Sequence, residues 1–274
     1  MGVDVSGLFI GLVTHPRTHF PDSRGAHGIT ARLADALESL GIPVSTLVED
    51  RDLAGDMPDL SEQELAQSRQ RLLETQRSWA TYCLRGDLKL RLGQWVSGMR
   101  GSIEPAGALQ ARRLLNIERA HLQLMSSSLD SESEFTLIIE DDAECSSIGD
   151  LALDLHELVT RTEPPYMAHV STSFSPKELG IENLIRSKER LWLNGGSEYS
   201  LLRPVTNTVC ATVYRRDFLA RVHELWRAEP LVPVIPVDWR LNELLMRMNM
   251  TGLLPEGYAS LVYPSPVIQR SLHS

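Results

Sequence analysis

The chain has 274 residues, of which 42% are hydrophobic and 23% are charged, as is typical of a globular protein with a sizeable core. Its net charge of −9 argues against nucleic acid or an anionic membrane as the main partner. No run reaches the ~18 apolar residues of a membrane-spanning helix, and no signal peptide is evident at the N-terminus. We therefore expect a cytoplasmic protein without a membrane span.

The three cysteines, Cys83, Cys145 and Cys210, are scattered through the chain. Their spacing matches neither a zinc site nor a disulfide framework. We expect all three to be free thiols in a reducing compartment.

The first fifty residues predict a βαβ unit. Residues 8–13 are a short apolar run typical of a buried strand, and residues 29–40 carry apolar side chains at helical spacing up to Gly41. Residues 42–48 predict a second strand that ends at Glu49 and Asp50. No G-x-G-x-x-G motif follows the first strand, which argues against a dinucleotide-binding Rossmann domain.

Residues 56–101 predict a helical insertion. Ser61 and Glu64 have the spacing of a capping box, which begins a polar helix over residues 61–82, and residues 87–99 are a second candidate helix. The segment has too few apolar residues to form a core of its own. Packing against the main domain is its default role, and acceptor binding is the alternative. A longer helix follows over residues 108–129, where His121 on the apolar face is best explained as a core histidine.

The most informative stretch is a short apolar run, residues 135–139, that ends at Glu140, Asp141 and Asp142. Its length and β-branched content predict a buried strand, and open α/β sheets bind ligands at the carboxyl ends of their strands. Three adjacent carboxylates repel one another, so a bound cation would stabilise them. Oxygen ligands favour Mg²⁺ or Mn²⁺. The alternative is a turn whose solvated acids cap the helix that follows.

The rest of the chain continues the alternation of strands and helices. Asp238 follows Pro236 and Val237 and is a natural N-cap for a helix that carries Leu241 and Leu245, a role that contributes roughly 0.5–2 kcal/mol. The other predicted elements are a helix at 150–159, a strand at 167–171, an N-cap at Ser175, a turn at 194–197, a strand at 205–214, a helix from 215 through 226 and a strand at 259–263.

The segment Ile138–Glu144, IIEDDAE, resembles the acidic strand-end motif of GT-A fold glycosyltransferases, which use nucleotide sugars. It is most similar to the EDDA form of the lipopolysaccharide-modifying glycosyltransferases of family 25. The resemblance implies that Asp142 ligates the metal together with Glu140. It also implies that Glu140 and Asp141 hold the ribose and the donor sugar.

Further segments extend the resemblance to most of the chain. In GT-A enzymes the first βαβ unit binds the nucleotide, and several families carry an Arg-Asn pair on the helix before the acidic strand. A solvated surface or loop position explains each of the candidate residues in these segments equally well. The candidates for contacts with the base, ribose or diphosphate are Thr14, His15, Arg17, Glu49, Asp50, Arg112 or Arg113, and Asn116.

The second half supplies the catalytic candidate. Pro-Val-Asp before a helix is the form that this element takes in family 25, where the acid faces the acceptor hydroxyl. Asp238 would then be the general base, which implies inversion at the anomeric carbon. Residues 205–214 and the proline-serine tail also resemble family segments. The substrate-binding candidates are Asn207, Thr208, Gln269 and, next to the base, Trp239, and His273 is a candidate metal ligand.

We expect a single-domain GT-A α/β sandwich over residues 1–274 with a mixed, mostly parallel central sheet. The expected function is Mn²⁺- or Mg²⁺-dependent transfer of a sugar from a UDP- or GDP-linked donor to an unidentified acceptor. A nucleotidyltransferase of related fold is one alternative, although residues 14–28 lack the lysine of its glycine-rich loop. A non-catalytic relative that binds nucleotide is the other.

Overall fold

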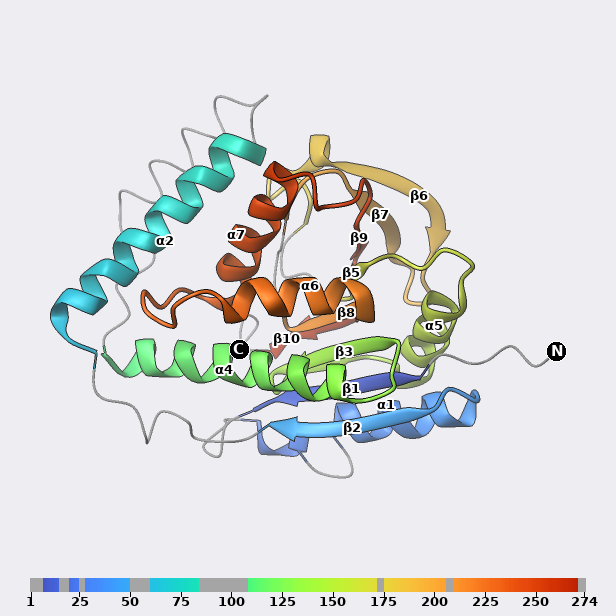
Figure 1. Cartoon of the computed structure of the whole chain (residues 1–274). Helices are drawn as coiled ribbons and strands as arrows, with labels where there is room; N and C mark the ends of the chain where they lie inside the picture. Colours follow the sequence, from blue (N-terminus) through green and yellow to red (C-terminus); the bar gives the residue numbers. More distant parts are fainter. Residues whose placement is uncertain are drawn as a thin grey trace.

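The computed structural model describes residues 7–14, 20–24, 28–49, 60–83, 108–171, 175–205 and 209–270. Its main strands are β1 (Leu8–Val13), β2 (Val44–Glu49), β3 (Phe135–Glu140), β5 (Met167–His169), β6 (Ile185–Leu191), β7 (Ser197–Leu201), β8 (Ala211–Arg215) and β9 (Ala259–Tyr263). Within these residues the eight strands form one sheet in the order β2-β1-β3-β8-β5-β9-β7-β6 (Figure 1).

The expectation of a mostly parallel sheet is wrong. In the described sheet only β1–β2, β1–β3 and β5–β9 pair parallel, and the other four neighbouring pairs are antiparallel. Strand β8 enters between β3 and β5 in the opposite direction, and a tight turn joins β6 to β7 as a hairpin. Gly195 in this turn has φ 84°, a conformation that glycine adopts at little cost. The turn predicted at residues 194–197 is thus confirmed as the turn of a hairpin.

Helices cover both faces of the sheet (Figure 1). Helices α1 (Ile29–Ser39) and α5 (Ile148–Thr160) pack on one face, where leucines and isoleucines of β1 and β3 form one core. Helices α4 (Ala108–Asp130), α6 (Arg216–Arg227) and α7 (Val237–Met250) cover the other face and enclose a second core. Helix α2 (Glu62–Cys83) packs against α7. None of the described helices is long and apolar enough to cross a membrane.

Several helix boundaries follow from local sequence. The capping box before α2 is confirmed, because the Glu64 backbone N–H donates to the Ser61 hydroxyl and the Ser61 N–H donates back to the Glu64 carboxylate. Helix α1 ends before Gly41, whose φ of 85° ends the helical path. Ser175 makes the same exchange with Glu178, but turns follow instead of the predicted helix. Two short 3₁₀ helices complete the description, η1 (Pro21–Arg24) and η3 (Glu182–Leu184).

Two features of the fold position the candidate site. Gly11 on β1 lies under α4, and a Cβ there would stand 2.9 Å from Leu124, so glycine allows α4 to lie close to the sheet. A separate two-stranded antiparallel sheet joins β4 (Ala143–Cys145) to β10 (Val267–Gln269). This pairing brings the end of the described chain to the acidic strand end. The division into one GT-A domain with an insertion at 56–101 stays a prediction, since only residues 60–83 of the insertion are described.

Candidate functional site

The carboxyl ends of β1, β2 and β3 meet at one edge of the sheet. Val13 lies level with both Glu49 on β2 and Glu140 on β3. The backbone N–H of Thr14 donates to the Glu49 carbonyl at 3.2 Å, and the Thr14 hydroxyl donates to the Asp141 carboxylate at 3.0 Å. The structure thus brings together four residues that the sequence analysis had placed near the nucleotide or metal.

A compact cluster of possible metal ligands lies at this edge. The ligand atoms of Glu140, Asp142 and Cys210 are within 4.8 Å of one another. The Cys210 thiol donates to Asp142 at 3.6 Å, and the Gln269 amide donates to the other Asp142 oxygen at 3.0 Å. Burial raises the pKa of the Cys210 thiol well above its usual range, and the charges of Glu140 and Asp142 raise it further. The thiol is therefore protonated in the metal-free protein.

Sequence reasoning missed Cys210 and treated the ligand set as oxygen only. The cysteine reaches the cluster because β8 pairs antiparallel with β3, and the Glu140 backbone N–H donates to the Cys210 carbonyl at 2.8 Å. The expected state of the thiols is confirmed for Cys145 and Cys210, which are both free. The side chain of Cys83 lies outside what the structure describes.

The tail contributes through β10. Besides Gln269, its neighbour Arg270 donates from its backbone N–H to the Asp142 carbonyl at 2.8 Å and from its guanidinium to the Asp141 carbonyl at 3.1 Å. Arg270 also pairs with Asp22 at 3.0 Å. The acidic strand end is thus fastened to the tail through backbone carbonyls, which leaves the Arg270 charge beside Asp141. Arg270 was not predicted as a site residue.

Asp238 lies at the start of α7, but its predicted role as N-cap is wrong. The helix begins at Val237, with Pro236 as the N-cap residue, so Asp238 is the second residue of the first turn. Val237 is buried in the core, which draws the first turn inward. The Asp238 carboxylate instead accepts hydrogen bonds from the backbone N–H groups of Trp239 and of Asp238 itself.

The environment of Asp238 weakens its acidity. The pKa of this carboxyl is raised to about 6: burial is the main cause, the negative charge of Glu140 adds to it, and the Trp239 N–H opposes both effects. Because the charge of Glu140 affects the pKa of Asp238, the Asp238 carboxyl group lies within electrostatic reach of the acidic cluster. A carboxyl group with a pKa near 6 can exchange protons near neutral pH, as a general acid or base must.

Trp239 follows Asp238 on α7, and its ring is braced by the helical insertion. Its partly exposed ring meets Trp79 of α2 edge to face, with centroids 5.9 Å apart and planes at 87°. The Trp79 indole N–H donates to the Pro204 carbonyl at 2.8 Å, which fixes Trp79 in turn. Through Trp79, helix α2 therefore supports the side chain of Trp239, the residue that follows Asp238.

The remaining candidates lie on α4 or outside the described residues. Asn116 is largely buried on α4, and Arg113 on the same helix is exposed. The others lie outside the described residues, which for Arg112 means its side chain: His15, Arg17, Asp50, Arg112, Asn207, Thr208 and His273.

No protein-family model matches the chain, and no curated protein matches it. The resemblance to family 25 glycosyltransferases therefore rests on the sequence motifs. The chemistry rests on the geometry: two carboxylates and a thiol converge at one strand end, and a further carboxyl group, Asp238, whose pKa is raised, lies within electrostatic reach.

Proposed function

We propose that the protein is a GT-A glycosyltransferase, similar to family 25, that transfers a sugar from a UDP- or GDP-linked donor to an acceptor hydroxyl with inversion. One observation carries the proposal. The potential metal ligands Glu140, Asp142 and Cys210 converge at the carboxyl ends of β1–β3, and Asp238 lies within electrostatic reach of them. This is the edge at which open α/β sheets bind ligands.

The residues present fit a divalent cation, Mn²⁺ or Mg²⁺. Asp142 and Glu140 would hold it, and Cys210 would join them if its proton is displaced. When bound, the cation would neutralise negative charge on the diphosphate leaving group. Thr14 and Asp141, which are joined by a hydrogen bond, and Glu49 would line the nucleotide side of the site.

Asp238 would carry out the proton transfer. The acceptor oxygen attacks the anomeric carbon while the bond from that carbon to the diphosphate oxygen breaks, and the hydroxyl proton passes to the Asp238 carboxylate. With a pKa of about 6, the carboxyl group is mainly ionised at pH 7 and is more basic than an ordinary aspartate. Trp239, the next residue, would offer the partly exposed surface of its ring to the acceptor.

Binding is tested first. A thermal-shift panel of UDP- and GDP-sugars should raise the melting temperature only when Mn²⁺ or Mg²⁺ is present, because a ligand that binds the native state stabilises it by mass action. Asp142→Ala should abolish this metal-dependent shift. Glu144→Ala removes an exposed acid two residues away and should leave the shift intact. An unchanged shift in Asp142→Ala would mean that the acidic cluster is only a turn.

Turnover is tested at Asp238. Asp238→Asn keeps a side chain that can accept the backbone hydrogen bonds and should melt close to wild type. Slow hydrolysis of the donor should nevertheless fall by about 10² or more, because the amide cannot accept the proton. Equal hydrolysis by the variant would refute the role of Asp238 as base.

The products separate the alternatives. A glycosyltransferase releases nucleoside diphosphate and free sugar from the donor. A nucleotidyltransferase would instead cleave between the phosphates and release nucleoside monophosphate and sugar phosphate. Metal-dependent binding of the donor with neither product would indicate a non-catalytic relative.

A further inference from the structure

His121 on α4 contacts the metal-ligand cluster from the side of the core. Its Nε2 lies 3.3 Å from the Glu140 carboxylate oxygen Oε1. The histidine is 1% exposed, whereas Glu140 keeps 17% of its side chain accessible. A buried imidazole therefore holds one carboxylate oxygen from behind, and the accessible part of Glu140 faces the site.

The tautomer of His121 follows from its surroundings. The other ring nitrogen, Nδ1, is buried and meets no hydrogen-bond partner among the described residues. A proton on Nδ1 would be a buried donor without an acceptor, which is costly. The proton therefore sits on Nε2, and Nε2–H donates to Glu140. This donation fixes the orientation of the Glu140 carboxylate.

The imidazole is itself held by a chain of contacts. The Trp226 ring lies nearly parallel to it, with centroids 6.4 Å apart and planes at 18°. The Trp226 indole N–H donates to Glu118 at 2.8 Å, and the same Glu118 oxygen lies 3.4 Å from Arg240 Nε. Glu118 and Arg240 are each 1% exposed.

This chain of contacts reaches α7, the helix that carries the proposed base. Arg240 lies on α7, two residues after Asp238, and its guanidinium also donates to the Pro233 carbonyl at 2.8 Å, just before the helix. Glu118 thus ties α4, which carries His121, to the start of α7. One buried set of contacts therefore links His121, beside the proposed metal ligand Glu140, to the first turns of α7, the helix that carries the proposed base Asp238.

We infer that His121 is a positioning residue for Glu140: it fixes this carboxylate, through Nε2–H, in the orientation that binds the divalent cation. The inference rests on the proposed function, since it assigns a role toward the proposed metal. Residues that hydrogen-bond a metal ligand commonly contribute about 10- to 100-fold to metal affinity, and His121 would contribute in this way as a donor to Glu140.

The test measures Mn²⁺ affinity directly, by titration calorimetry or by the paramagnetic resonance signal of free Mn²⁺. His121→Phe keeps a flat ring against Trp226 and removes the donor, so Mn²⁺ should bind about 10- to 100-fold more weakly. His121→Gln places an amide N–H where Nε2–H was and should recover most of the affinity. His223→Phe, at another buried histidine on α6, is the matched control and should bind Mn²⁺ like wild type.

Stability alone does not explain this pattern, since a merely structural histidine would lower the melting temperature of the Phe variant without changing Mn²⁺ affinity in the folded protein. Wild-type affinity in folded His121→Phe, or a Gln variant as weak as the Phe variant, overturns the inference. If His121→Phe does not fold, His121→Leu gives the same comparison. If Asp142→Ala removes Mn²⁺ binding while His121→Phe keeps it, the positioning role fails and the proposed metal site stands. If wild type binds no Mn²⁺, the proposed function fails first.

Discussion

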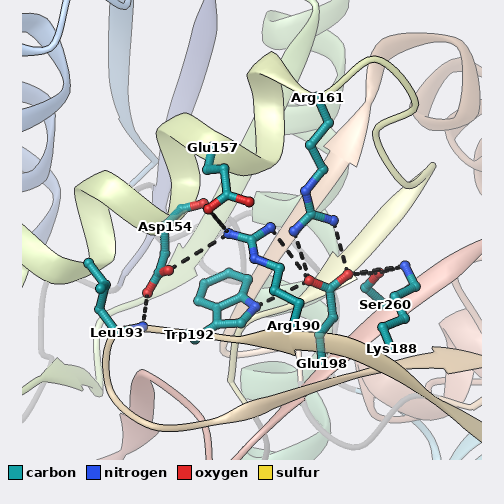
Figure 2. A network of polar contacts seen from close by, with 9 residues as sticks. All are labelled: Asp154, Glu157, Arg161, Lys188, Arg190, Trp192, Leu193, Glu198 and Ser260. Atoms are coloured by element: carbon teal, nitrogen blue, oxygen red, sulfur yellow. Dashed lines mark hydrogen bonds and ion pairs between the residues drawn. The ribbon is translucent and has the colours of Figure 1, made fainter.

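Two buried carboxylates, Glu198 and Asp142, lie in opposite kinds of surroundings. Glu198 is fully buried on β7 and receives two hydrogen bonds from Arg161, at 3.0 and 2.8 Å, and one from Lys188 at 3.0 Å. Figure 2 shows these cations and Arg190 pointing toward it. Asp142 accepts hydrogen bonds from a neutral amide and a neutral thiol and shares its cluster with Glu140.

The difference separates a structural network from a candidate ligand site. Burial alone would raise the pKa of Glu198, but the Arg161 bonds and the nearby cations lower it to about 2, so this charge is matched within the protein. Near Asp142, two carboxylates raise the pKa of the neighbouring Cys210 thiol instead. Like charges gathered in a buried place are most simply stabilised by a cation from outside.

The largest effect is expected at Glu198. Glu198→Gln leaves Arg161 and Lys188 without their countercharge, so the free energy of unfolding should decrease. Removing one partner of a buried ion pair costs about 3–5 kcal/mol, and we expect a decrease near the lower end of this range because both cations are partly exposed. Urea denaturation measures the change. Glu189→Gln, an exposed acid on the neighbouring strand β6, should change stability little. Equal effects of the two substitutions would mean that the network adds no stability.

The same network predicts a pH dependence of stability. The folded pKa of Glu198, about 2, lies below its ordinary value of 4.5, so its contribution is complete above pH 4.5 and is lost as the pH falls toward 2. Denaturation curves measured across this range should show the loss in wild type but not in Glu198→Gln.

Each region also holds an aspartate whose pKa is raised to about 6, mainly by burial: Asp238 at the site and Asp154 in the network. If Asp238 is the base, donor turnover should rise about 10-fold per pH unit below pH 6 and level off above it, because only the ionised form accepts a proton. Asp154→Asn should keep this profile, and Asp238→Asn should abolish it. A profile that changes with Asp154 would contradict the separation of the two regions.

A smaller effect is expected at Cys210. If the thiol loses its proton to a metal, Co²⁺ should produce a sulfur-to-metal charge-transfer band in the near ultraviolet, and its affinity should rise with pH. Cys210→Ser should remove the band and weaken the binding of Co²⁺ by about 10-fold or more, since losing even a residue that only hydrogen-bonds a metal ligand costs about 10- to 100-fold. Cys145→Ser is the control. No band in wild type would leave an oxygen-only site, suited to Mg²⁺ or Mn²⁺.

The smallest effect is expected at Asp142 in metal-free protein. Asp142→Asn removes one of two neighbouring negative charges, so the free energy of unfolding should change by less than about 1 kcal/mol, in contrast to Glu198→Gln. Added Mn²⁺ should then stabilise wild type but not the variant. A large decrease in the free energy of unfolding of the metal-free variant would mean that Asp142, like Glu198, is a structural carboxylate.

The sequence by itself determined the elements whose signals are local. The apolar spacing of Ile29, Leu33 and Leu37 predicted α1, the Ser61–Glu64 pair predicted the start of α2, and the run that ends at Glu140 predicted β3. These predictions succeeded because periodicity and capping depend on residues a few positions apart. The gathering of Thr14, Glu49 and Glu140 was also predictable, since adjacent parallel strands end at the same edge.

Only the tertiary structure decided which distant residues meet there. Cys210 and Gln269 reach Asp142 across 68 and 127 positions, through strand pairings that no local pattern specifies. Strand β8 could have paired in either direction, and its antiparallel course placed the thiol at the cluster. The place of His121 on an apolar helix face predicted that it is a core residue. Its contact with Glu140 depends on how closely α4 lies on β1, which Gly11 allows and the packing of the whole layer sets.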